Sequence, residues 1–157
     1  MLAKQQQRPV HYIATATASD TEMQRRIDHH QQRRPDHWVL SEEPIHLTRA
    51  INDTAHNAIV LVDCLTLWLN NLLLQFDQER FLAEKQNLLN SLKQIHCDGA
   101  KEIILVSNET GLGVVPLGEI SRRFIDESGW LHQAIAQQSD NVIFTVAGLP
   151  QVLKGDL

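Results

Sequence analysis

Short apolar runs alternate along the chain with longer amphipathic stretches. Runs rich in β-branched and aliphatic residues predict strands at about residues 10–16, 59–63, 103–109 and 141–148. Periods near 3.6 residues predict helices at about 66–75, 79–96 and 118–138, and another helical pattern opens after the first strand. The alternation of strand and helix predicts an α/β fold, with a mostly parallel sheet flanked by helices.

Length and charge narrow the class of protein. A chain of 157 residues with 43% apolar residues is expected to form one globular domain spanning residues 1–157. The net charge of −5 argues against a general nucleic-acid binder, and the basic residues gather at positions 25–34, as at a small-anion site. No apolar run approaches the roughly 20 residues of a membrane span, and the N-terminus lacks a signal-peptide core, so a cytoplasmic location is expected.

The segment 25–38 carries the strongest chemical signal. It places His29 and His30 between two arginine pairs and then reaches a proline. A neutral imidazole can attack phosphorus, and guanidinium groups can hold phosphate oxygens and neutralise their charge, so the segment suggests nucleotidyl transfer through a histidine adduct. The alternative is the solvated end of an ordinary helix. A metal site is disfavoured, because adjacent histidines point about 100° apart on a helix.

Two strand ends offer further candidates. Asp63 follows four aliphatic residues, where it would emerge at the carboxyl edge of the sheet and hold Mg²⁺, although many α/β proteins carry this pattern without a metal. The segment 108–116 contains two glycines, which either allow close approach to a ligand or simply form a tight turn. Cys64 and Cys97 lack CxxC spacing and suggest neither a disulfide nor a zinc site.

The sequence as a whole resembles the bifunctional adenosylcobinamide kinase/adenosylcobinamide-phosphate guanylyltransferases of cobalamin biosynthesis. The resemblance rests on motifs at residues 12–16, 26–38, 42–43, 62–72, 107–116 and 146–150. It implies a RecA-like P-loop fold, a cytoplasmic and usually trimeric enzyme, and two reactions. One phosphorylates adenosylcobinamide with ATP or GTP. The other transfers GMP from GTP, with Mg²⁺, to adenosylcobinamide phosphate.

The resemblance also implies roles for single residues. His30 matches the histidine that carries GMP in this family, and Asp63 matches a metal-binding position. His29 is a candidate for a secondary role. Contacts with the guanine nucleotide or its metal are implied for Ala14, Thr15, Ala16, Gln31, Gln32, Arg33, Arg34, Glu42 and Asp63.

One family motif is absent from the printed sequence. The family begins with a strand and a Gly-x-x-x-x-Gly-Lys-Ser/Thr loop that cradles phosphates, and no such motif occurs among these 157 residues. We therefore expect an N-terminally truncated chain that lacks the first strand and P-loop of the fold, with impaired kinase activity. A non-catalytic remnant that binds nucleotide or corrinoid is the alternative. In addition, Gln31 stands where the family more often has a basic residue.

Overall fold

The computed structural model describes residues 8–18, 21–99 and 101–156; the side chains of Arg26, His30 and Arg33 lie outside this described part. Contacts divide the chain into two compact units, Met1–Glu109 and Thr110–Leu157, and each is described by itself.

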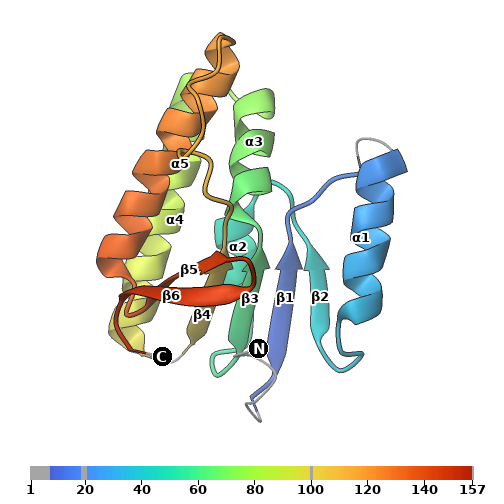
Figure 1. The fold of residues 1–157 in the computed structure, drawn as a ribbon. Helices are drawn as coiled ribbons and strands as arrows, with labels where there is room; N and C mark the ends of the chain where they lie inside the picture. The colour runs from blue at the N-terminus through green and yellow to red at the C-terminus, as the bar shows by residue number, and fades with distance from the viewer. Residues whose placement is uncertain (1–7, 19–20, 100, 157) are drawn as a thin grey trace. The chain divides into compact units, whose positions relative to one another are not determined.

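The first unit contains a four-stranded parallel sheet (Figure 1). Its strands are β1 (Val10–Ala14), β2 (Val39–Glu42), β3 (Ile59–Asp63) and β4 (Glu102–Val106), in the order β2-β1-β3-β4. All three neighbouring pairs run parallel. The predicted parallel sheet is therefore confirmed, as are its strands near residues 10, 59 and 103.

Four helices connect these strands: α1 (Thr21–Arg33), α2 (Leu47–Asn52), α3 (Leu65–Gln75) and α4 (Gln78–Asp98). Since crossovers between parallel strands are right-handed, the strand order places α1 on one face of the sheet and α2, α3 and α4 on the other. Ile13, Val60 and Val62 alternate toward one face and are fully buried. The core is completed by buried side chains of α2 to α4, among them Leu47, Ile51, Trp68, Leu69, Leu72, Phe81 and Leu88.

The long helix α4 has clear start and stop signals. The Asp77 side chain accepts a hydrogen bond from the Arg80 backbone N–H at 2.9 Å and so caps the first turn. Gly99 ends the helix in the left-handed conformation, at φ 62°. The sequence predicted that this helix begins at residue 79, and it begins one residue earlier, at Gln78.

The second unit consists of α5 (Glu119–Gln138) and an antiparallel hairpin of β5 (Val142–Val146) and β6 (Leu149–Lys154). The expectation that residues 141–148 extend the parallel sheet was wrong: β5 pairs with β6 instead. Ala147 and Gly148 both have positive φ, 51° and 77°, which is the backbone of a tight two-residue hairpin turn. Lys154 then donates hydrogen bonds to the carbonyls of Ala136 and Gln137, which ties the hairpin to the end of α5.

Among the described residues, no helix is both long enough and apolar enough to cross a membrane.

Candidate functional site

The direction of chain progression reverses between β1 and β3. From β1 the chain passes to β2 on one side, whereas from β3 it passes to β4 on the other (Figure 1). In parallel α/β sheets, ligands bind at the carboxyl ends of the two strands that flank such a reversal. The register places Ala14 opposite both Asp63 and Glu42 at this edge. Three of the predicted site residues thus lie side by side.

Thr15 joins the ends of β1 and β3. Its backbone N–H donates to the Asp63 carbonyl at 3.0 Å. Its hydroxyl donates to the Cys64 carbonyl at 2.7 Å and accepts from the Cys64 N–H at 2.9 Å. The side chain of Asn71 donates to the Thr15 carbonyl at 2.9 Å. Thr15 is fully buried, so the contacts of its hydroxyl fix the position of Asp63 relative to Ala14.

The Asp63 carboxylate is bound from the neighbouring strand. The Tyr12 hydroxyl donates a hydrogen bond of 2.5 Å to Asp63 Oδ2. The Tyr12 ring stacks with Trp38 at a centroid distance of 6.3 Å, and the Arg34 guanidinium lies 5.1 Å from the centre of the same ring. Burial, followed by the hydrogen bond to Asp63 and its negative charge, raises the pKa of Tyr12 above the usual range of a phenol. A phenol is protonated at neutral pH, and the raised pKa extends the role of Tyr12 as a donor to more alkaline pH.

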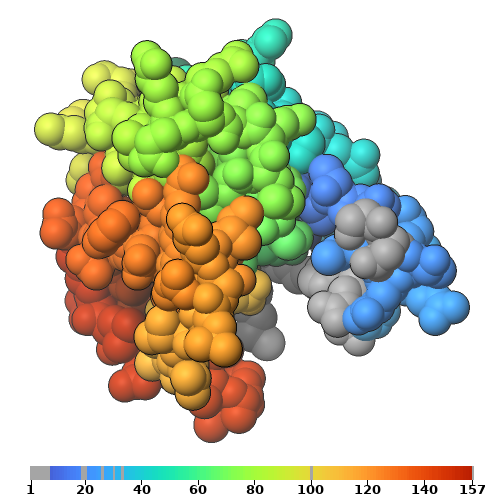
Figure 2. Space-filling model, turned by 90° about the horizontal axis from the view of Figure 1, so that it is seen from above, coloured from blue at the N-terminus to red at the C-terminus, as the bar shows by residue number. Residues whose placement is uncertain are grey.

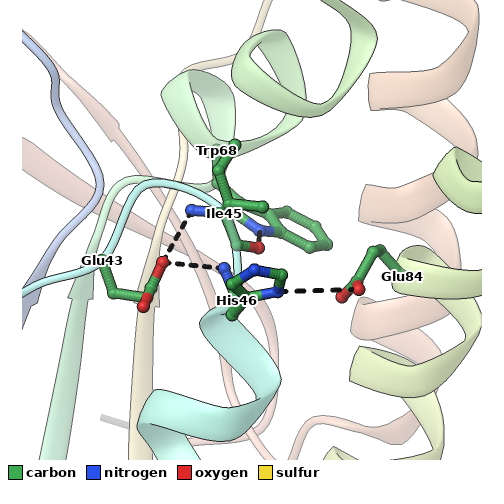
Figure 3. Close-up of polar contacts among 5 residues, drawn as sticks. All are labelled: Glu43, Ile45, His46, Trp68 and Glu84. Atoms are coloured by element: carbon green, nitrogen blue, oxygen red, sulfur yellow. Dashed lines mark hydrogen bonds and ion pairs between the residues drawn. The ribbon is translucent and has the colours of Figure 1, made fainter. Parts of the chain in front are cut away.

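The loop after β2 is held by internal contacts (Figure 3). Glu43 Oε1 accepts hydrogen bonds from the N–H groups of Ile45 and His46, at 3.0 and 2.8 Å. Trp68 Nε1 donates to the Ile45 carbonyl at 2.8 Å, and His46 Nδ1 lies 3.9 Å from Glu84. Glu43 therefore stabilises the entry into α2. Its neighbour Glu42 is the exposed acid at the end of β2.

A second hydroxyl cluster lies at the ends of β3 and β4. Thr66 Oγ1 and Ser107 Oγ are 3.2 Å apart, and the Asn108 N–H donates to Thr66 Oγ1 at 2.8 Å. Asp63 and Val106 are paired in register just before these residues. Burial raises the pKa of the nearby Cys64 thiol.

The predicted nucleophile is placed only through its helix. His30 lies in the last turn of α1, but its side chain and that of Arg33 are outside the described residues. Helix α1 runs antiparallel to β1, so its last turn leads away from the carboxyl edge (Figure 1). Its described side chains at positions 29, 31 and 32 are exposed, and the surface of α1 projects from the unit (Figure 2).

The described residues contain no group of three or more acidic, histidine or cysteine side chains that could hold a metal ion. Asp63 nevertheless fits Mg²⁺, which proteins often bind through one or two carboxylates together with substrate phosphates and water. Tyr12 occupies Oδ2 of Asp63 as a hydrogen-bond donor and leaves the carboxylate charge in place.

The chain is similar to known proteins over nearly its whole length. Residues 1–153 match the family described as cobinamide kinase / cobinamide phosphate guanyltransferase. The bifunctional adenosylcobalamin biosynthesis protein CobP of Pseudomonas aeruginosa is 57% identical over 148 residues, covering 94% of this chain and 83% of the relative. The bifunctional adenosylcobalamin biosynthesis proteins CobU of Escherichia coli K12 and Salmonella typhimurium LT2 are 33% and 34% identical, each covering 91% of this chain and 84% of the relative.

These matches confirm the family predicted from the sequence motifs. The chain belongs to the cobinamide kinase / cobinamide phosphate guanyltransferase family.

Proposed function

We propose that this chain transfers GMP from GTP to adenosylcobinamide phosphate through a covalent adduct on His30. The observation that carries the proposal is the alignment of Ala14, Glu42 and Asp63 at the strand reversal of a chain in this family. Contacts with the nucleotide are proposed for the residues that the family motifs mark, namely Ala14, Thr15, Ala16, Gln31, Gln32, Arg33, Arg34, Glu42 and Asp63.

The reaction proceeds in two displacements. An unprotonated ring nitrogen of His30 attacks the α-phosphorus of GTP, the new N–P bond forms, and the bond to the β-phosphate oxygen breaks to release pyrophosphate. A phosphate oxygen of adenosylcobinamide phosphate then attacks the same phosphorus, and the N–P bond breaks to regenerate the imidazole. Arg33 and Arg34 bind phosphate oxygens. Asp63 is the proposed ligand for Mg²⁺, which when bound neutralises charge on the phosphates.

The proposal requires His30 to approach a nucleotide at the carboxyl edge. In α1, only Met23 and Ile27 are half-buried among the described side chains. Little packing energy therefore opposes a change in the position of this helix. Hydrogen exchange of the α1 amides should slow when GTP and Mg²⁺ are added. Exchange rates that GTP leaves unchanged would argue against this approach.

Radiolabelled GTP tests the transfer itself. The chain is incubated with GTP labelled at the α-phosphate and Mg²⁺, and protein-bound label is measured after denaturation. His30→Ala should abolish an acid-labile adduct, whereas the matched variant His29→Ala should retain it. Addition of adenosylcobinamide phosphate should move the label from protein to adenosylcobinamide-GDP. Label that persists in His30→Ala would show that the nucleophile is another residue.

Further features of the proposal follow from the family. We propose that the protein acts in the cytoplasm as a homotrimer, which light scattering tests. The kinase reaction on adenosylcobinamide, with ATP or GTP, is proposed as the second activity, in keeping with the family description. A chain that binds GTP but releases no pyrophosphate would favour the alternative, a non-catalytic binding protein.

A further inference from the structure

We propose that Tyr12 is a positioning residue that orients the Asp63 carboxylate toward the metal ion of a bound nucleotide. This inference rests on the proposed metal-binding role of Asp63, and it adds a residue that the family motifs leave without a function. The two residues lie on adjacent strands, 51 positions apart in the sequence.

The hydrogen bond determines which carboxylate oxygen faces the site. Tyr12 pairs in register with Leu61, and Asp63 lies two residues further along β3, so both side chains are on the same face of the sheet. This diagonal arrangement lets the long tyrosine side chain reach Asp63 Oδ2 at 2.5 Å. A carboxylate with one oxygen held in this way would ligate a nucleotide-bound metal through a single oxygen. Single-oxygen ligation suits Mg²⁺, which requires octahedral geometry with several waters.

Tyr12 is itself held in place. Its ring stacks with Trp38, and the Arg34 guanidinium lies 5.1 Å from its centre. Arg34 follows the last residue of α1 directly, so a series of contacts runs from the end of the His30-bearing helix through Tyr12 to Asp63. A ring fixed by two neighbours loses little further side-chain entropy when it donates its hydrogen bond. The phenol therefore supports Asp63 in a defined rotamer before a nucleotide arrives.

Tyr12→Phe removes the hydroxyl and keeps the ring. Nucleotide affinity is measured by calorimetry with a GTP analogue that carries a methylene bridge between its α- and β-phosphates, once with Mg²⁺ and once with EDTA. Loss of a group that orients a metal ligand typically costs 10- to 100-fold. We expect Tyr12→Phe to reduce the metal-dependent gain in affinity by about 10-fold or more, with unchanged affinity in EDTA.

Two controls separate positioning from general destabilisation. Thr54→Val removes a buried hydroxyl that donates to the Ile51 carbonyl at 2.8 Å, away from Asp63, and should leave the metal-dependent gain intact. In an Asp63→Asn background, Tyr12→Phe should have no further effect, because the residue acts through the carboxylate. An equal gain in Tyr12→Phe and the unmodified chain would overturn the proposal.

A second measurement does not require the Tyr12→Phe variant. Tyr12 is the single tyrosine of the chain, so 3-fluorotyrosine labels one site. Mg²⁺ added to the nucleotide-bound chain should shift its fluorine resonance, and should not do so in Asp63→Asn. An unshifted resonance overturns the inference. Metal-dependent binding without a GMP adduct would instead refute the proposed transfer while leaving the role of Tyr12 intact.

Discussion

The hydrogen bonds of Thr15 provide a direct test of how the strand ends are held together. Thr15→Val keeps the shape of the side chain and removes its hydroxyl. The buried Cys64 N–H, now 2.9 Å from that oxygen, loses its partner. The Cys64 carbonyl loses one of two donors, because the Trp68 N–H still donates to it at 3.2 Å. An unsatisfied buried polar group costs about 1–3 kcal/mol, and one such group is created, so the free energy of unfolding should fall by about 1–3 kcal/mol.

That loss is a substantial part of the 5–15 kcal/mol typical of a folded domain, and at about 2–4 °C per kcal/mol it lowers the melting temperature by roughly 2–12 °C. Urea denaturation followed by tryptophan fluorescence measures the change. Thr15→Ser is the matched control, since it keeps the hydroxyl and loses one methyl group, worth about 1 kcal/mol. The reasoning is refuted if Thr15→Val costs less than about 1 kcal/mol, or no more than Thr15→Ser.

Three further predictions concern other parts of the chain. Cys64 is buried with a raised pKa, whereas Cys97 is exposed, so a thiol reagent should react with the chain in a fast and a slow phase. Cys97→Ser should remove the fast phase, and a fast phase that survives in this variant contradicts the assignment. The absorbance of Tyr12 in the folded chain should remain that of a neutral phenol above pH 10, near the pKa of free tyrosine. The free energy of unfolding should fall as the pH rises above 10, because the unfolded chain releases this proton first. Ionisation of Tyr12 near pH 10 in the folded chain would be contrary evidence. Gly155→Ala places a Cβ 2.5 Å from a backbone carbonyl at φ 77°, whereas Gly148→Ala has the same φ and open space around the Cβ. Gly155→Ala should therefore lower the free energy of unfolding by at least about 1 kcal/mol more than Gly148→Ala. Equal losses in urea denaturation would be evidence against the steric argument.

Sequence patterns predicted the helices α3, α4 and α5 and the apolar strand β3 well, and the shorter or more polar elements poorly. The run of aliphatic residues before Asp63 predicted a buried strand, and β3 occupies the same residues. Strand β2 has four residues, two of them polar, and α2 has six, so neither contains enough of a repeat to be recognised. The strand at residues 142–146 was recognised, but its partner was not, because a turn with Ala147 at positive φ has no strong sequence signal.

Candidate site residues were predicted where they sit at strand ends. The rule that ligands bind at the carboxyl edge of a parallel sheet marked Asp63, whereas Ala14 was marked by the family resemblance, and the register pairs the two. The bond from Tyr12 to Asp63 depends on the register of strands distant in sequence, which composition does not specify. The arginine residues around His30 in the sequence indicated its chemistry. They did not indicate its distance from the sheet edge, because that distance depends on how α1 packs.

The most direct test of the central claim is to identify the residue that carries GMP. The chain is treated with GTP and Mg²⁺, digested at neutral or alkaline pH to preserve a phosphoramidate, and its peptides are sequenced by tandem mass spectrometry. The account predicts a single GMP adduct on His30, removed when adenosylcobinamide phosphate is added. An adduct on His29 or any other residue, or pyrophosphate release without an adduct, would contradict it.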